Sequence, residues 1–177
     1  MFYKNYEALR LRAAGGKRRK IAVAAAHDAE VVKTAETAQR EGIADFVLVG
    51  DKAKIEELLA GCGAKSAYEI IDEADEAQAS LAAAELVRSG EADVLMTGIV
   101  NSSVFLQAVL DNEKALKTGR RLSHLAVFHI PSYHKLVLPS SARLLPYPSL
   151  AAYTAIGTHA PHALGTTGLI MPKLAVL

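Results

Sequence analysis

The sequence predicts an α/β protein in which helices cover a mainly parallel β-sheet. Between residues 21 and 110, short apolar segments alternate four times with segments of helical periodicity, and aspartate or glycine stands at most junctions. The composition fits a globular fold, because 51% of the 177 residues are hydrophobic and 22% are charged. A formal net charge of +1 argues against a general affinity for nucleic acid or for an anionic membrane surface.

The chain shows no signal for a membrane span or for export. Its apolar runs, such as Ile21–Ala26, fall far short of the ~20 residues that cross a bilayer, and charged residues interrupt its first sixteen positions. Cys62 is the single cysteine, so no disulfide can form within the chain. We therefore expect a cytoplasmic protein with no membrane partner.

The first elements are a short helix and a buried strand. The pattern of Phe2–Ala13 is typical of an amphipathic helix that ends at Gly15 and Gly16. The basic run Lys17–Lys20 then leads into a strand over Ile21–Ala25, whose continuous apolar character indicates burial on both faces. We interpret the basic run as a solvated strand entry, because no aromatic residues are interleaved with it.

Aspartates that follow the first two strands predict helix starts, since a carboxylate can accept hydrogen bonds from free amides there. Asp28 begins a helix that runs to about Arg40, and Asp51 begins one that ends near Gly61. The strand between these two helices is expected over Phe46–Val49.

A weaker third strand, Ala67–Ile71, precedes the clearest helix of the chain. The apolar positions that define the expected buried face of this helix are Ala74, Ala77, Leu81, Ala84 and Val87. We interpret the acidic stretch Asp72–Glu76 as helix electrostatics, and Gly90 as the end of the helix. A fourth strand, Asp93–Met96, leads through a loop into a helix that ends near Leu110.

The last third of the chain predicts a hairpin and a domain boundary. Leu125–Ile130 and Lys135–Leu138 are strand candidates joined by a tight turn, which would add an antiparallel element to the sheet. Prolines at 139, 146 and 148 mark a linker. We expect a first α/β domain over residues 1–140. Residues 141–177 are expected to hold the linker and the truncated start of a second domain, because a strand-like segment at 173–177 has no further sheet to join.

The loop Thr97–Ser103 is the strongest candidate site, because ligands of open α/β sheets bind beyond the carboxyl ends of the strands. Gly98 permits a close approach of the backbone, and Asn101, Ser102 and Ser103 offer polar groups beside the free amides of a helix start. These features predict an anion site. Ordinary N-capping by Asn101 or Ser102 is the alternative interpretation.

Other polar residues give weaker signals. Arg120 lies in a basic stretch and has the planar fork that suits phosphate oxygens. Ser123 and His124 are neighbours on a predicted strand and point to opposite faces, which excludes a local nucleophile and base pair. His159 and His162 could share a metal only with a third ligand that the sequence does not offer, so no metal site is predicted.

Several segments of the sequence resemble one enzyme family. They are Ala92–Ser103, Phe105–Leu106, Leu116–Arg120 and Ser123–Phe128. These residues resemble the phosphate acetyltransferase/phosphate butyryltransferase family, and its butyryl branch most closely. The resemblance extends from about Arg18 to Ser140, with weaker traces as far as Leu177.

The resemblance implies a two-domain α/β fold similar to the isocitrate and isopropylmalate dehydrogenases, here with an incomplete second domain. It implies transfer of an acyl group between coenzyme A and inorganic phosphate, with coenzyme A as a substrate and with no cofactor or metal. Acyl-CoA or coenzyme A, with phosphate or acyl phosphate, would be the partners of a homo-oligomer. The substrate-binding positions that it implies are Gly98, Asn101, Ser102, Ser103, Arg120 and Ser123; it assigns no catalytic residue within the chain.

Three residues depart from the family pattern. Gln107 stands where arginine is usual, Thr97 where the butyryl branch often has lysine, and Ser141 where an acid is usual. The catalytic serine and aspartate of the family's second domain would fall after Leu177. Two main hypotheses follow: a phosphate acyltransferase of the butyryl type, or a truncated, non-catalytic remnant that at most binds an anion or coenzyme A. An unrelated α/β binding module is a third.

Overall fold

The computed structural model describes residues 5–110, 116, 122–133, 136–140, 149, 154 and 157–158. The chain divides into two compact units, one formed by Leu11–Thr118 and the other by Met1–Arg10 with Gly119–Leu177. The domain boundary expected at residue 140 falls inside the second of these units and stays a prediction. Residues 141–148 of the expected linker and the strand-like segment at 173–177 lie outside the described residues.

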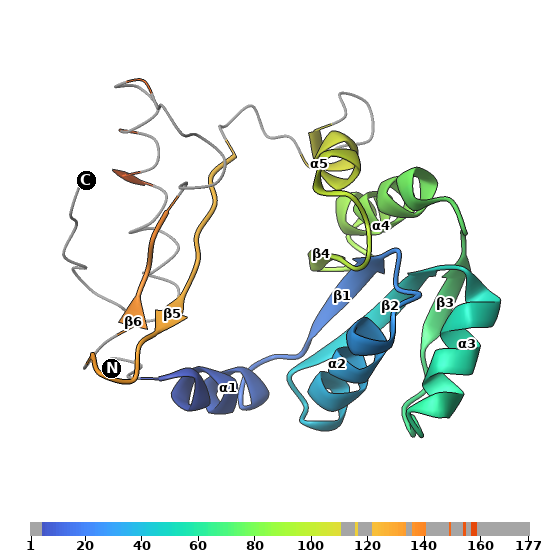
Figure 1. The fold of residues 1–177 in the computed structure, drawn as a ribbon, viewed down its shortest axis with the longest axis horizontal. Helices are drawn as coiled ribbons and strands as arrows, with labels where there is room; N and C mark the ends of the chain where they lie inside the picture. The colour runs from blue at the N-terminus through green and yellow to red at the C-terminus, as the bar shows by residue number, and fades with distance from the viewer. Residues whose placement is uncertain are drawn as a thin grey trace. The chain divides into compact units, whose positions relative to one another are not determined.

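The unit Leu11–Thr118 is built on a four-stranded parallel sheet (Figure 1). Its strands lie in the order β3-β2-β1-β4; they are β1 (Arg19–Ala24), β2 (Ala44–Gly50), β3 (Glu69–Asp72) and β4 (Val94–Thr97). In the central strand, Ile21 pairs with Phe46 on one side and with Val94 on the other. The predicted parallel α/β fold is therefore confirmed.

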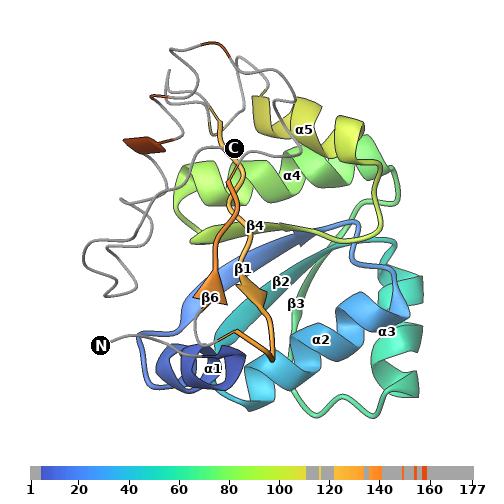
Figure 2. The ribbon, with the colours of Figure 1, turned by 60° about the vertical axis from the view of Figure 1, so that its left-hand side comes forward.

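Helices cover both faces of this sheet. They are α2 (Ala29–Arg40), α3 (Lys52–Gly61), α4 (Glu76–Ser89) and α5 (Ser102–Leu110), while α1 (Tyr6–Ala14) precedes β1. Figure 2 shows α4 and α5 on one side of the sheet and α2 and α3 on the other. The core divides accordingly. Val23, Leu48 and Ile55 belong to the cluster beneath α2 and α3, and Ala22, Ala24 and Ala83 to the cluster beneath α4.

The helix caps largely follow the sequence. The Asp28 carboxylate accepts from the amides of Glu30 and Val31, and Asp51 accepts from the Lys54 amide at 3.1 Å, as the sequence predicts for both aspartates. Helix α4 begins after Asp75 and ends at Gly90, whose φ of 83° only glycine adopts without strain.

The buried face of α4 differs from the one expected. Ala79, Ser80, Ala83 and Ala84 are buried, whereas Ala77 is exposed and Ala74 lies before the helix. Alanine is small enough to stand on either side of a helix, so its spacing alone does not fix which side meets the sheet. The helix prediction is confirmed. Its predicted buried face is right at Ala84, which is buried, and at Val87, which packs against the core cluster, but it is wrong at Ala77.

The other unit contains a short hairpin. Strands β5 (Phe128–His129) and β6 (Leu136–Val137) pair antiparallel, with an isolated bridge from Leu125 to Ser140. Within the described residues, these two strands form a sheet of their own. The predicted hairpin is confirmed, but the expectation that it extends the parallel sheet is wrong there. In the same unit, the Tyr6 hydroxyl donates to the Val127 carbonyl and links the start of α1 to the hairpin.

None of the helices in the described part of the chain combines the length and apolar character that crossing a membrane requires.

Candidate functional site

The carboxyl ends of the strands place a topological switch point between β1 and β4. From β1 the chain continues into α2 on one face of the sheet, whereas β4 leads into α5, which lies with α4 on the opposite face (Figure 2). In open α/β sheets, ligands bind where the loops after two neighbouring strands diverge to opposite faces, so the carboxyl ends of β1 and β4 are the place to look for a site.

The loop that follows β4 is fastened to the end of β1 by main-chain contacts. The Gly98 amide donates to the Ala24 carbonyl at 2.7 Å, and the Ile99 amide donates to the Ala25 carbonyl at 3.1 Å. A Cβ on Gly98 would lie 2.7 Å from the Ala24 oxygen and closer still to that of Ala25. This position therefore requires glycine, because any side chain would collide with two carbonyl groups.

The other partner in this contact is also unusual. Ala25 has a φ of +52°, and no other described non-glycine residue has a positive φ. This left-handed conformation is strained for a residue with a Cβ. It occurs where the chain leaves β1, beside the candidate loop. Strained backbone of this kind is enriched at ligand-binding sites.

Helix α5 begins directly after this loop. Asn101 Oδ1 accepts from the Ser103 amide at 2.9 Å and from the Ser103 hydroxyl at 2.7 Å. The Ser102 hydroxyl has no hydrogen-bond partner among the described residues, and all three polar side chains are exposed. Asn101 thus caps the helix as the alternative interpretation requires, while Ser102 stays available to a ligand.

Helix α5 differs from its neighbours in charge. Helices α2, α3 and α4 are capped by Asp28, Asp51 and Asp75, and their carboxylates neutralise the positive ends of the helix dipoles. Hydrogen bonding from the Lys54 amide, followed by that from the Lys54 side chain, lowers the pKa of Asp51 and favours its charged form. The cap of α5 is the uncharged Asn101. Among these helix starts, an anion meets the least repulsion at α5.

One histidine at the carboxyl ends of the strands was not singled out from the sequence. His27 follows β1, and its Nδ1 is buried with no hydrogen-bond partner among the described residues. A Cβ on Gly50 would come within 2.9 Å of that nitrogen, so the glycine makes room for the imidazole ring. The available signal was position alone, since His27 stands three residues after the end of the buried strand β1.

The remaining predicted residues divide between the two units. Gly98 and the three polar residues of the α5 start come together in Leu11–Thr118, and Gln107 lies exposed one turn further along α5. Ser123 is half-buried in the other unit. Arg120, Ser141, His159 and His162 lie outside the described residues. In the described part of the chain, no cluster of His, Cys, Asp or Glu could hold a metal.

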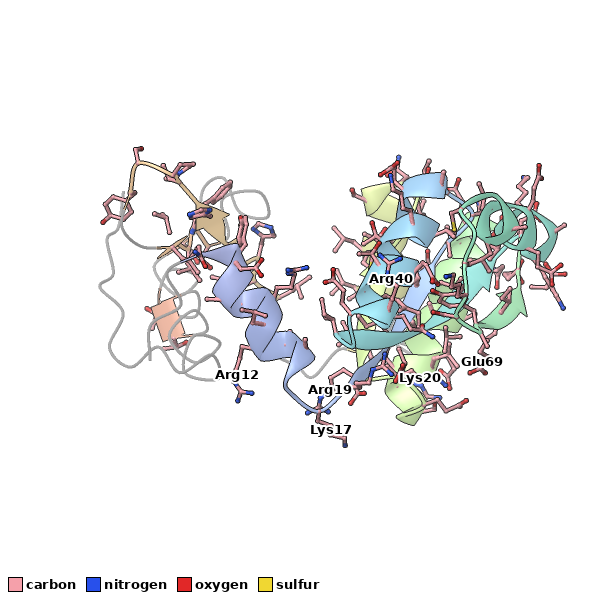
Figure 3. The ribbon with its side chains drawn as sticks, turned by 90° about the horizontal axis from the view of Figure 1, so that it is seen from below. Arg12, Lys17, Arg19, Lys20, Arg40 and Glu69 are labelled. Atoms are coloured by element: carbon pink, nitrogen blue, oxygen red, sulfur yellow. The ribbon has the colours of Figure 1, made fainter. Side chains whose placement is uncertain are left out.

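The amino ends of the strands have a different character. Arg19 contacts Asp93 at 2.6 Å, Lys20 contacts Glu69 at 2.8 Å, and Arg18 contacts Asp45 at 3.3 Å. Figure 3 is seen from the side of these strand ends and shows Lys20 on the same side of the sheet as Glu69. Three of the four cations in the basic run are thus paired with carboxylates of neighbouring segments, which agrees with a solvated strand entry.

Comparisons with known proteins identify relatives. The sequence model of the family described as phosphate acetyl/butaryl transferase matches residues 64–177. The phosphate butyryltransferase of Clostridium acetobutylicum is 33% identical over 173 residues, which cover 97% of this chain and 58% of that protein. The enzyme of the same name from Clostridium beijerinckii is 35% identical, with 97% and 57% covered. The chain thus spans a little more than half the length of these relatives.

Solved structures share the fold. A branched-chain phosphotransacylase from Enterococcus faecalis superposes with a TM-score of 0.72 at 23% identity, over 87% of this chain and 54% of that one. A phosphotransacetylase from Staphylococcus aureus gives a TM-score of 0.69 at 18% identity, over 92% of this chain and 58% of that one. At these identities, the likeness concerns the fold.

Proposed function

We propose that this chain, which belongs to the phosphate acetyl/butaryl transferase family, works as a phosphate acyltransferase of the butyryl type. The substrates would be an acyl phosphate and coenzyme A in one direction, and an acyl-CoA and inorganic phosphate in the other. Support for the butyryl branch comes from two clostridial relatives named phosphate butyryltransferase, at 33% and 35% identity.

The observation that carries the proposal is the start of α5 at the switch point. A phosphate group there would accept hydrogen bonds from the amides of Ser102 and Val104. These amides lie in the first turn of α5, so the helix itself provides no carbonyl acceptor for them. The Ser102 hydroxyl can add a third bond. Gly98 holds the loop against β1, so these donors keep a fixed position relative to the sheet.

The proposed chemistry is a substitution at the acyl carbon. The thiolate sulfur of coenzyme A attacks the carbonyl carbon of the acyl phosphate, and a carbon–sulfur bond forms. The bond from that carbon to the phosphate oxygen then breaks, and phosphate leaves with the electron pair. Amide donors that already hold the phosphate stabilise the charge that grows on it, because they need no reorganisation during the step.

Arg120 and Ser123 enter the proposal through the family resemblance, as further phosphate or coenzyme A contacts. The guanidinium of Arg120 would supply a positive charge for the phosphate, which the neutral Gln107 on α5 does not supply. The neutral Gln107 favours the second candidate function, a protein that binds an anion or coenzyme A without turnover.

The proposal also covers the setting of the protein. We propose a cytoplasmic homo-oligomer that uses coenzyme A as a substrate and needs no separate cofactor. The single cysteine of the sequence supports a reducing compartment.

The test is thioester formation from coenzyme A with butyryl phosphate and with acetyl phosphate, on a chain whose thermal transition shows that it is folded. Ser102→Ala is expected to lower kcat/KM by about tenfold to a hundredfold, since hydrogen bonds to charged groups are worth about 1.5–3 kcal/mol. Ser89→Ala, at the far end of α4, is the matched control and should have no effect.

Each result separates the two candidate functions. Turnover that falls in Ser102→Ala supports the acyltransferase. A folded chain that binds phosphate without turnover supports the binding protein. A folded chain that neither binds phosphate nor forms a thioester contradicts both.

A further inference from the structure

A large apolar side chain is exposed beside the proposed phosphate site. Ile99 is 53% exposed, and it precedes by two residues the asparagine that caps α5. An exposed isoleucine leaves apolar area in contact with water, which is unfavourable unless something covers it. Because Ile99 lies next to the candidate site, a ligand bound there would cover it.

Ile99 is held in place. Its amide donates to the Ala25 carbonyl at 3.1 Å, and the preceding amide, of Gly98, donates to the Ala24 carbonyl at 2.7 Å. The loop therefore cannot turn this side chain into the core without losing two main-chain hydrogen bonds. The apolar surface that it offers is already ordered before a ligand arrives, which lowers the entropy cost of binding.

The other exposed apolar residues of this unit lie elsewhere. Within the described part of Leu11–Thr118, the large exposed hydrophobic residues are Leu11, Val94, Ile99 and Leu110. Leu11 belongs to α1, Val94 lies at the amino end of β4, and Leu110 ends α5. Of these four, Ile99 alone stands at the carboxyl ends of the strands.

We propose that Ile99 contacts the acyl chain of an acyl phosphate bound at the start of α5, and so selects butyryl over acetyl groups. This inference rests on the proposed function. An acyl phosphate joins a charged phosphate to an apolar chain. When the amides of α5 bind the phosphate, the chain lies on the adjoining surface, and Ile99 is the apolar part of that surface.

The size of the effect follows from the area covered. Removing one methylene from water changes a binding constant by about fourfold, and a butyryl group carries two methylenes more than an acetyl group. A side chain on an open surface covers only part of the chain. We therefore expect butyryl phosphate to bind about fourfold more tightly than acetyl phosphate.

The experiment compares two matched substitutions on the same strand and its loop. Ile99→Thr keeps a β-branched side chain and removes its apolar reach. Val94→Thr makes the equivalent change at the other end of β4, where the valine is 44% exposed. Dissociation constants of inorganic phosphate, acetyl phosphate and butyryl phosphate are measured by titration calorimetry on the full chain and on each variant.

The expected result is a change of selectivity alone. In Ile99→Thr, the dissociation constants of acetyl phosphate and butyryl phosphate should become about equal, and that of inorganic phosphate should not change. Val94→Thr should keep the fourfold preference for butyryl phosphate. Ile99→Val, which retains most of the apolar area, should keep it as well.

The outcomes distinguish this inference from the function beneath it. A preference that persists in Ile99→Thr, or that is absent from the parent chain while phosphate binds, overturns the role of Ile99 and leaves the phosphate site standing. A folded parent chain that binds none of the three ligands overturns the proposed function, and the role of Ile99 with it.

Discussion

The two ends of the parallel sheet treat their polar groups in opposite ways. At the amino ends, Arg18, Arg19 and Lys20 each face a carboxylate from a neighbouring segment. At the carboxyl end of β4, the start of α5 keeps free amides and the Ser102 hydroxyl has no partner among the described residues. Polar groups that are satisfied within the fold need no ligand, whereas unsatisfied groups on a fixed backbone are available for one.

This contrast assigns different tasks to the two ends. Exposed ion pairs contribute little to stability. At the amino ends of the strands, their main effect is to neutralise the charges of the basic run. The carboxyl end combines free donors at α5, an exposed apolar side chain at Ile99 and a strained residue at Ala25. Such a combination is typical of a binding site on a rigid scaffold.

The largest expected effect comes from breaking the backbone contact at the carboxyl end. Gly98→Ala would place a Cβ against the carbonyls of Ala24 and Ala25, so the loop must move away from β1. We expect a loss of about 3 kcal/mol or more in the free energy of unfolding, measured with urea, because overpacked and strained backbone positions give the largest mutational effects.

The control for this change is Gly61→Ala at the end of α3. A Cβ at Gly61 meets nothing within 4 Å. Alanine is also the better helix former, so this variant should be equal to or more stable than the parent. Equal stability of Gly98→Ala and Gly61→Ala would show that the loop is not held as described.

A smaller effect is expected at a buried carboxylate that already has its partners. Glu36 is 8% exposed, and it accepts from the Lys65 amide at 3.1 Å and from the Tyr68 hydroxyl at 2.8 Å. Glu36→Ala leaves both donors without an acceptor, at a cost of about 1–3 kcal/mol in urea unfolding. Glu57→Ala, on the exposed side of α3, is the control and should change stability by less than about 0.5 kcal/mol.

Glu36 also predicts a pH dependence. Burial alone raises the pKa of its carboxyl, but hydrogen bonds from Lys65, Tyr68 and Ser66 outweigh burial and bring the pKa below its usual value. A carboxyl with a lowered pKa in the folded state stabilises the fold above its unfolded-state pKa, and this stability is lost as the pH falls through the folded value. The difference between the parent and Glu36→Ala should therefore shrink in acid.

The smallest effect is expected at the amino end of the sheet. The Lys20 amide and then the Arg19 side chain donate hydrogen bonds to Asp93 and lower the pKa of its carboxyl. Asp93→Asn should destabilise the chain slightly at neutral pH and progressively less as the pH falls below the ordinary range of aspartate. A variant whose stability matches the parent at every pH would show that this pair contributes nothing.

Much of the fold could be predicted because its signals are local. A buried strand reads as a continuous apolar run, and Asp28 and Asp51 cap the helices that follow the first two strands. The face of α4 could be predicted only in part, since alanines at Ala77 and Ala83 look alike in sequence while only Ala83 is buried against the sheet. The placement of the hairpin depends on contacts distant in sequence, which spacing does not encode.

The candidate site divides in the same way. Gly98 and the polar residues of the α5 start are adjacent in sequence, so one loop predicts them together. The role inferred for Ile99 depends on its exposure, and the position of the His27 ring depends on Gly50, which lies on another strand. Those neighbours become visible only when the sheet is assembled.

The alanines between α4 and the sheet have a mechanical consequence. Ala22 and Ala24 of β1 share a buried cluster with Ala79 and Ala83 of α4, so much of the contact between the two layers is made by methyl groups. Phe105 of α5 also packs against this cluster. The size of these side chains therefore sets the distance of α4 and α5 from the sheet. A single larger side chain in this cluster would displace α5, and the candidate site at its start, without replacing any residue of that site.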